Sequence, residues 1–386
     1  MDTTKFGNTS PGSLCRINTE WGPDFAFTPN HLPPEKGSFP DRLWPLLAEA
    51  RHHVGMLEGL GRTLPNPGIL LRPLEDREAI QSSRLEGTYA SPRELLLFEL
   101  DPRESKSGRD PSNDHREVFN YRLALNHGTS SPLPISQRLM KELHALLMSG
   151  VRGRDKSPGE FRKIHVGIGY GGRFIPPPPE NLAECLDSLE KYCHVQQSSF
   201  DPLVDSFFVH YQFETVHPFI DGNGRVGRLL LAIMLQQRCA LTKPWLYMSE
   251  YFEQSREEYM QRLFDVSARN DWAGWINFCL IGTLKQAKET IHRCERLLAI
   301  REGFAAKLAN CKGSLRLKRI IDDVFHSPFV RVKDLPKRLG ITYPTAKQDV
   351  QRLVDAGILK ELQNIKPRTY FAPEVFSVAY EKLDNP

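Results

Sequence analysis

A twelve-residue loop, 217–228, most constrains how this chain can fold, because it lies between two segments of amphipathic helical spacing, 201–216 and 226–237. The loop contains Gly-Asn-Gly at 222–224, directly before the second helical segment. Glycines allow a sharp turn whose N–H groups point outward, and a helix N-terminus adds about half a positive charge. The pattern therefore predicts two helices joined by an anion-binding turn.

The charged and titratable side chains of this loop indicate which anion it binds. Arg225 and Arg228 lie in the first turn of the second helix, where they can add charge-assisted hydrogen bonds to a polyphosphate. His217 changes charge near neutral pH, which suits a general base. Asp221 offers a hard oxygen ligand for Mg²⁺, which usually shares its ligands with a nucleotide. The loop lacks Walker spacing, so the predicted phosphate site is of another kind.

The loop resembles the signature of the Fic family, H-x-F-x-(D/E)-G-N-G-R-x-x-R, at all of its fixed positions. These positions are His217, Phe219, Asp221, Gly222, Asn223, Gly224, Arg225 and Arg228. The resemblance implies a mainly α-helical Fic-type core with a small β-hairpin flap. It also implies an enzyme that uses Mg²⁺ and transfers AMP from ATP to a hydroxyl of a target protein.

The resemblance assigns a role to each position of the loop. His217 would deprotonate a Ser, Thr or Tyr hydroxyl of the target, and Asp221 would hold Mg²⁺ against the α- and β-phosphates. The Gly-Asn-Gly turn would form the anion hole, Arg228 would reach the γ-phosphate, and Phe219 would pack inward. The expected phosphate-binding set is Gly222, Asn223, Gly224, Arg225, Val226, Gly227 and Arg228.

Residues 151–181 alternate short apolar runs with Gly and Pro, which is typical of a β-hairpin. The resemblance implies that this hairpin is the family's flap, an exposed edge over the active site that pairs with an extended target segment. Four prolines at 176–179 would end the pairing. Tyr259 lies where relatives carry an aromatic residue near the adenine, although Tyr at helical spacing is also typical of a core. The residues expected in the flap are Val166, Gly167, Ile168, Gly169, Phe174 and Ile175.

Residues 82–87 match the family's inhibitory pattern, (S/T)-x-x-x-E-(G/N), with Ser82, Glu86 and Gly87 at the fixed places. The pattern precedes the signature, as in the class whose inhibitory helix is N-terminal and in the same chain. A carboxylate paired with Arg228 would occupy the partner of the γ-phosphate and repel the charge of that phosphate. We therefore expect Glu86 to inhibit transfer.

Composition and periodicity divide the chain into four parts: a flexible arm over 1–40, a helical region with the inhibitory motif over 41–110, a catalytic core over 111–305 and a C-terminal domain over 306–386. The last part has the order of a winged helix-turn-helix, three helices followed by two short strands. Lys347, Arg352, Lys366 and Arg368 favour DNA there, whereas Asp349 and Asp355 offset these charges on the same helix, so a protein partner is the alternative.

The remaining features are those of a soluble cytoplasmic protein. Net charge is only +4, no apolar run is long enough to cross a membrane, and the N-terminus lacks an apolar signal core. Seven scattered cysteines favour neither disulfides nor zinc. Alternative functions are transfer of UMP, phosphocholine or phosphate by the same loop, removal of AMP, or a nucleotide-sensing DNA-binding regulator. A homodimer is expected from the resemblance alone.

Overall fold

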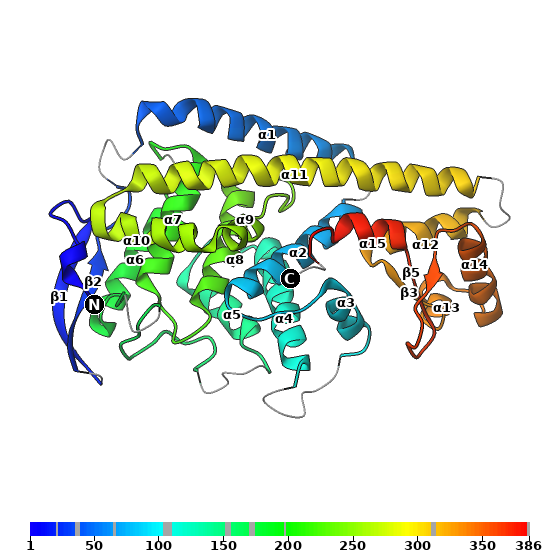
Figure 1. The fold of residues 1–386 in the computed structure, drawn as a ribbon, viewed down its shortest axis with the longest axis horizontal. Coiled ribbons are helices and arrows are strands. Elements are labelled where there is room, and N and C mark those ends of the chain that lie inside the picture. The colour runs from blue at the N-terminus through cyan, green and yellow to red at the C-terminus, as the bar shows by residue number, and fades with distance from the viewer. Residues whose placement is uncertain are drawn as a thin grey trace.

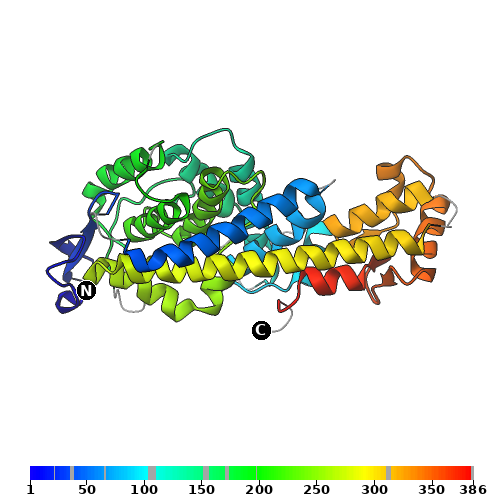
Figure 2. The same ribbon diagram turned by 90° about the horizontal axis from the view of Figure 1, so that it is seen from above.

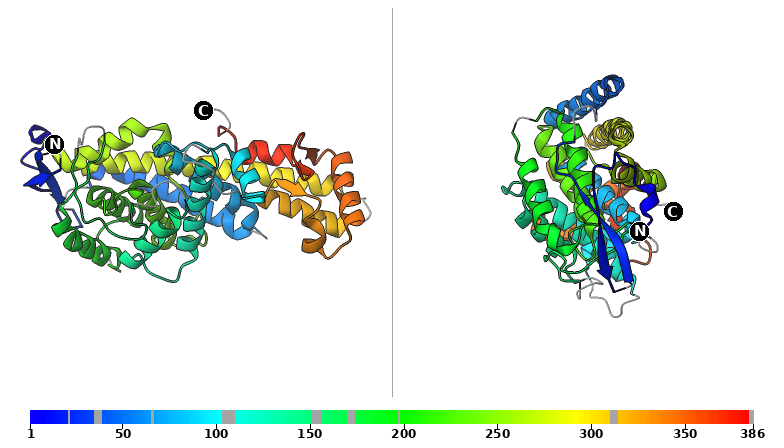
Figure 3. Two further views of the ribbon diagram at one scale, coloured as in Figure 1. Left: turned by 90° about the horizontal axis from the view of Figure 1, so that it is seen from below. Right: turned by 90° about the vertical axis from the view of Figure 1, so that its left-hand side faces the viewer.

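The computed structural model describes residues 1–20, 22–34, 39–64, 67–102, 110–150, 156–169, 174–196, 198–309 and 314–383. The chain forms an elongated, mainly helical molecule in which α1 (Trp44–Thr63) and α11 (Trp272–Lys307) run side by side along one edge (Figures 1 and 2). Leu47, Val54 and Leu57 recur on one face of α1 and are buried, as their spacing predicted. Seen along the long axis in Figure 3, the other helices lie on one side of this pair.

The helical core lies beneath the first half of α11. Its helices are α3 (Pro92–Leu100), α4 (Ser112–Ser130), α5 (Gln137–Leu147), α6 (Leu182–Cys193), α7 (Pro202–Val216), α8 (Asn223–Arg238), α9 (Ser249–Gln254) and α10 (Arg256–Arg269). Short 3₁₀ turns occupy Thr3–Lys5, Asp41–Leu43 and Pro179–Asn181. The sequence did not predict α3, α6 and α9, whereas the helices on both sides of the loop are confirmed. Helices α7 and α8 pack against each other and are buried along most of their length.

Part of the segment predicted as a flexible arm over 1–40 is a folded hairpin, which corrects the prediction made there from Pro, Gly, Ser and Asn content. Strands β1 (Gly12–Thr19) and β2 (Gly22–Pro29) pair antiparallel as a hairpin. Phe27 is fully buried, its ring packs near Phe6 and Phe174, and its N–H donates to the carbonyl of Ile175. These distant aromatic contacts hold the hairpin, and a local pattern does not contain them.

Helix α2 (Gly68–Leu85), which carries the inhibitory pattern, lies between the core and the C-terminal part and packs on α4, α9 and α12 (Figure 1). Its buried surface is unusually charged. Asp76 accepts from Arg122 at 2.9 Å and from Tyr380 at 2.8 Å, and Glu78 accepts from Tyr121 at 2.9 Å. Because a buried charge is stable only when it is paired, specific polar contacts hold this helix together with buried apolar side chains such as Leu74 and Ile80.

The C-terminal part has the predicted order of three helices followed by two strands, with an extra strand and an extra helix. The elements are α12 (Ser314–His326), β3 (Phe329–Arg331), α13 (Leu335–Leu339), α14 (Tyr343–Asp355), β4 (Lys360–Glu361), β5 (Thr369–Phe371) and α15 (Pro373–Ala379). The strands form one sheet of order β3-β5-β4. Asp349 does not offset charge on the outer face of α14, because it is buried and accepts two hydrogen bonds from Arg316.

No helix within the described part of the chain combines the length and apolar character that a membrane span needs. The six cysteines that the structure describes are free thiols, and Cys311 lies outside the described residues. The division of the chain at 40, 110 and 305 stays a prediction.

Candidate functional site

The signature loop joins the C-terminal end of α7 to the N-terminal end of α8, and two left-handed residues shape it. His217 ends α7 with φ 50°, and Gly222 precedes α8 with φ 77°. Asn223 closes the turn between them. Its side chain accepts from the N–H of Phe219 at 2.8 Å and donates to the carbonyl of the same residue at 2.9 Å. The predicted turn is present, with the helix beginning at Asn223, and its binding of an anion stays a prediction.

The ring of His217 has a defined orientation. Nδ1 lies 3.2 Å from the carbonyl oxygen of Glu214, which can only accept, so Nδ1 carries the proton and Nε2 keeps its lone pair. Burial lowers the pKa of His217 to about 4, although the bond to Glu214 opposes the shift. The imidazole is therefore neutral at physiological pH, which is the form that accepts a proton.

A second histidine, His144 of α5, supports the loop from beneath and was missed by the sequence reasoning. Its ring stacks on Phe219 with centroids 3.9 Å apart. Nδ1 accepts the N–H of Gly159 at 2.8 Å, so Nε2 carries the proton that it donates to the carbonyl of Asp221 at 3.1 Å. The full burial of Phe219 confirms its predicted inward packing. A lone His at helical spacing gives no signal for such a contact.

Asp221 is exposed, and its Oδ1 accepts the N–H of Gly222 at 2.6 Å. Among the residues that the structure describes, no group of three or more His, Cys, Asp or Glu side chains could hold a metal by itself. A single carboxylate beside a phosphate-binding turn fits Mg²⁺, which keeps several waters and takes other ligands from the nucleotide. The donor set thus suits a cation that binds together with a triphosphate.

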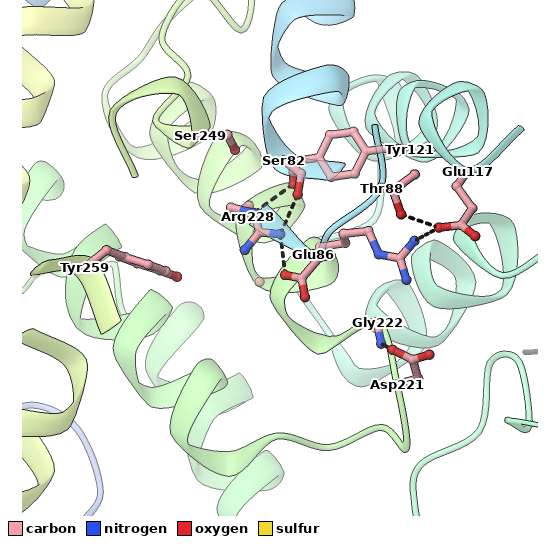
Figure 4. A network of polar contacts seen from close by, with 12 residues as sticks. Ser82, Glu86, Thr88, Glu117, Tyr121, Asp221, Gly222, Arg228, Ser249 and Tyr259 are labelled. Carbon is pink, nitrogen blue, oxygen red and sulfur yellow. Dashed lines mark hydrogen bonds and ion pairs between the residues drawn. The ribbon is translucent and has the colours of Figure 1, made fainter. Parts of the chain in front are cut away.

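The guanidinium of Arg228 is buried and bound by the inhibitory pattern (Figure 4). Nη2 donates to Oε1 of Glu86 at 2.7 Å and to the carbonyl of Ser82 at 2.9 Å, and Nε donates to the Ser82 hydroxyl at 2.8 Å. Burial alone would raise the pKa of Glu86, but the charge of Arg228 lowers it. The side chain of Glu86 remains 36% exposed, so the ion pair borders an opening rather than a closed core.

Glu86 reaches this position because α2 ends beside the loop. Gly87 follows with φ 82°, a conformation that favours glycine, and the chain turns away after the carboxylate.

A second carboxyl group, that of Glu214, also lies close to the first turn of α8. A Cβ added to Gly227 would lie 2.1 Å from Oε1 of Glu214. Burial, with Arg228 opposing and Glu86 adding, raises the pKa of Glu214 to about 7. The carboxyl groups of Glu86 and Glu214 thus both interact with the charge of Arg228.

Arg225, the first arginine of the loop, is buried and bound from α4, which the sequence did not predict. Its Nη1 donates to Oε2 of Glu117 at 3.2 Å, and the same oxygen accepts from the hydroxyl of Thr88 at 2.8 Å. Thr88 follows Glu86 by two residues. The segment after α2 therefore contacts both arginines, one directly and one through Glu117.

The structure places Tyr259 in a buried aromatic stack, 4.4 Å from Phe252 between ring centroids, with its hydroxyl 2.9 Å from Nε2 of His210. The hydroxyl end points toward Arg228 in Figure 4. Contact with adenine stays a prediction. Val226 is buried on the inner side of α8.

The segment predicted as the flap forms a single antiparallel bridge between Ile168 and Phe174, with hydrogen bonds of 2.7 and 3.2 Å. Residues 151–155 and 170–173 lie outside the described residues. Beyond the bridge, Ile175 bonds to β2 through the N–H of Phe27. Val166, Gly167 and Gly169 flank the bridge and form no named strand, whereas an edge strand was expected there. Their role over the active site stays a prediction.

The chain matches family models and known proteins. Residues 44–130 match the family model described as Fic/DOC family N-terminal, and residues 134–235 match the model described as Fic/DOC family. A protein adenylyltransferase Fic from Drosophila grimshawi is 33% identical over 129 residues, which are 32% of this chain and 26% of that protein. The counterpart from Drosophila melanogaster is 32% identical over 32% of this chain and 25% of its own length. The match therefore spans about a quarter of these relatives.

Solved structures share the fold at lower identity. A Fic family protein from Desulfovibrio desulfuricans G20 superposes with a TM-score of 0.56 and 20% identity, covering 89% of this chain and 98% of that protein. Fic-1 from C. elegans superposes with a TM-score of 0.52 and 20% identity, covering 65% and 74%. The first of these matches extends beyond the residues that the two family models cover.

Proposed function

Because the chain belongs to the Fic/DOC family, we propose that it is a protein adenylyltransferase that Glu86 holds inactive. The observation that carries the proposal is the ion pair between Glu86 and Arg228, at 2.7 Å, beside a neutral His217. An inhibitory carboxylate on the innermost arginine of an anion site is useful only where a polyphosphate is the substrate. Protein adenylylation is the activity that the curated relatives are named for.

In the proposed reaction, Nε2 of His217 accepts the proton of the target hydroxyl. The hydroxyl oxygen forms a bond to the α-phosphorus of ATP, and the bond from that phosphorus to the bridging oxygen of pyrophosphate breaks. The N–H groups at the start of α8 and the guanidinium groups of Arg225 and Arg228 neutralise the charge of the phosphates. Proton removal, alignment and charge neutralisation are therefore divided among residues of one loop.

Asp221 would hold Mg²⁺, which neutralises charge on the α- and β-phosphates when it is bound. The exposure of the Asp221 side chain leaves its second oxygen accessible to a cation that arrives with ATP. The Oδ1 bond to the N–H of Gly222 fixes the orientation of the carboxylate. Asp221 would therefore be a pre-oriented ligand for Mg²⁺ that arrives with ATP, rather than one member of a site made only of protein ligands.

Inhibition follows from competition for one cation. The γ-phosphate and the carboxylate of Glu86 are both anions that would pair with Arg228. Beside the same guanidinium they would lie close together and repel each other. With Glu86 in place, ATP would bind with its γ-phosphate displaced, and the α-phosphorus would not face the target oxygen. Withdrawal of Glu86 would release Arg228 and permit the in-line arrangement.

The test is intact-mass spectrometry of the Glu86→Gly protein after incubation with ATP and Mg²⁺, beside Glu86→Gly/His217→Ala. We expect a mass gain of one AMP unit in the first protein and none in the second. A gain that corresponds to another group with the matching donor, such as UMP from UTP or phosphate from ATP, would replace AMP transfer by that alternative. No gain with any nucleoside triphosphate, even when cell lysate supplies target proteins, would contradict the proposal.

The C-terminal domain suggests a second candidate role, binding of duplex DNA. On α14 the side chains of Tyr343, Lys347 and Gln348 are exposed, and the acid at 349 is turned inward and neutralised by Arg316. Lys366 and Arg368 are exposed on the connection between β4 and β5. A decrease of affinity for duplex DNA with salt would support this role. Absence of binding at low salt would leave a protein partner as the role of this domain.

A further inference from the structure

Arg162 holds three consecutive carbonyl groups of the loop that carries the proposed base. Its Nε donates to the carbonyl of His217 at 2.8 Å, and Nη2 donates to that of Val216 at 3.3 Å. The main-chain N–H of Arg162 donates to the carbonyl of Pro218 at 2.9 Å. These bonds meet the C-terminal end of α7, where carbonyls lack helical partners and a cation is favoured.

The same guanidinium reaches both arms of the flap. Nη1 donates to the carbonyl of Ile164 at 3.0 Å, on the arm that leads to Ile168. Nη2 donates to the carbonyl of Pro177 at 2.6 Å, on the arm that returns from Phe174. Arg162 therefore joins three segments that are separate in the sequence: the two arms of the flap and the loop of His217.

The environment shows that this arginine is not held by an ordinary ion pair. Its residue is 3% exposed, and every hydrogen-bond acceptor that the structure gives its side chain is a main-chain carbonyl. Burial lowers the pKa of Arg162 to about 10. A buried cation without a carboxylate is costly, and only the rigid fork of a guanidinium can donate to four carbonyls in different directions.

The backbone of His217 needs such support. A non-glycine residue at φ 50° is strained, and Pro218, which follows it, has no N–H with which to continue the helix. The bonds from Arg162 fix the carbonyls on either side of the strained residue. They thereby fix the direction in which the imidazole leaves the main chain.

We propose that Arg162 is a positioning residue that couples the flap to the base, so that a target segment on the flap and Nε2 of His217 stay at a set separation. The inference rests on the proposed transfer reaction and deepens it by naming what aligns the target with the base. The guanidinium would act through His217 and the flap and would not touch ATP. Its loss should therefore lower the rate of transfer without weakening nucleotide binding.

The experiment compares Arg162→Lys and Arg162→Gln in the Glu86→Gly protein, with transfer of AMP to the chain itself as the readout. Lysine keeps the charge but cannot bridge four carbonyls. We expect both variants to lose at least tenfold in rate at saturating ATP, while the ATP concentration for half-maximal rate changes by less than about twofold. A lysine variant that transfers AMP as fast as its parent would overturn the proposal. A change in the half-saturating ATP concentration as large as the change in rate would also overturn it.

Arg238→Lys is the matched control, because Arg238 also donates to carbonyls after a helix, those of Cys193 and Val195 at the end of α6. It lies outside the proposed site, and we expect its transfer rate to be unchanged. Amide hydrogen exchange gives a second readout that needs no activity. We expect faster exchange in 159–169 and 216–222 together in both Arg162 variants and in neither segment of the control. Exchange that is unchanged, or changed in one segment only, would refute the coupling even if the parent protein transfers no AMP.

Discussion

A Cβ added to Gly224 would lie 2.2 Å from Oε1 of Glu86. The missing side chain at Gly224 therefore leaves the space that the carboxylate of Glu86 occupies. Since Oε1 is held by Arg228, it cannot withdraw without breaking a partly buried charge-assisted hydrogen bond. The proposed inhibition therefore requires a residue without a side chain at position 224.

Gly224→Ala should destabilise the folded protein by about 1–3 kcal/mol through this collision, and by clearly less in the Glu86→Gly background. Denaturant unfolding of the four proteins of the cycle measures the difference. Gly55→Ala is the control, because Gly55 lies inside α1 and, apart from the backbone of that helix and the two neighbouring residues, no described atom lies within 4 Å of the added Cβ. Alanine there should stabilise slightly. Equal destabilisation in both backgrounds would show that Glu86 is not the obstacle.

Ser82→Ala should weaken the inhibition in part. The hydroxyl of Ser82 accepts from Nε of Arg228, and its removal leaves that donor unpaired next to an ion pair that remains. We expect a rise of about tenfold in AMP transfer, smaller than that of Glu86→Gly. Ser83→Ala is the matched control, because Ser83 is equally buried and its hydroxyl has no hydrogen-bond partner within the described residues. A rise in the Ser83 variant would assign the effect to α2 as a whole.

Glu214 should make stability depend on pH. Its folded pKa, raised by burial to about 7, lies above the ordinary value of 4.5, so the folded state binds more protons between these two values. The contribution of Glu214 to stability therefore falls as pH rises from about 4.5 to 7. Glu214→Gln should be more stable than the parent by about 3 kcal/mol at pH 8, and this gain should disappear below about pH 4.5. Denaturant unfolding at several pH values is the measurement, and a pH-independent difference would contradict the prediction.

The parts of this site that the sequence revealed are those that a local pattern encodes. The loop, its flanking helices and the serine, glutamate and glycine of the inhibitory pattern each depend on neighbours within twelve positions. The sequence did not predict that Arg162, His144 and Glu117 belong to the site. Their partners are main-chain carbonyls or residues far along the chain, and such contacts produce no periodic pattern in the sequence. The N-terminal hairpin was not predicted because buried Phe27 is stabilised by residues about 150 positions away.

The sequence did not predict the burial of α2 for a related reason. Its charged residues are typical of an exposed helix, and only the folded chain supplies Arg122, Tyr380 and Tyr121 as partners. The C-terminal segment takes part in the same contacts. Arg77 donates to the carbonyls of Ala379 and Glu381. The residues after α15 are thus bound to α2, the helix that directly precedes Glu86.

Arg84, two residues before Glu86, donates to the carbonyl of Leu383 at 2.6 Å, so the C-terminal segment also holds the last turn of α2. If this contact stabilises the inhibited position by about 1 kcal/mol, Arg84→Ala should raise AMP transfer about fivefold. The same substitution should have no effect in the Glu86→Gly protein, which has no inhibition to lose. Arg296→Ala is the control, because Arg296 binds Glu381 of the same segment from α11 instead of from α2. Equal rises in the two alanine variants would show that loosening the segment, rather than releasing α2, activates the enzyme.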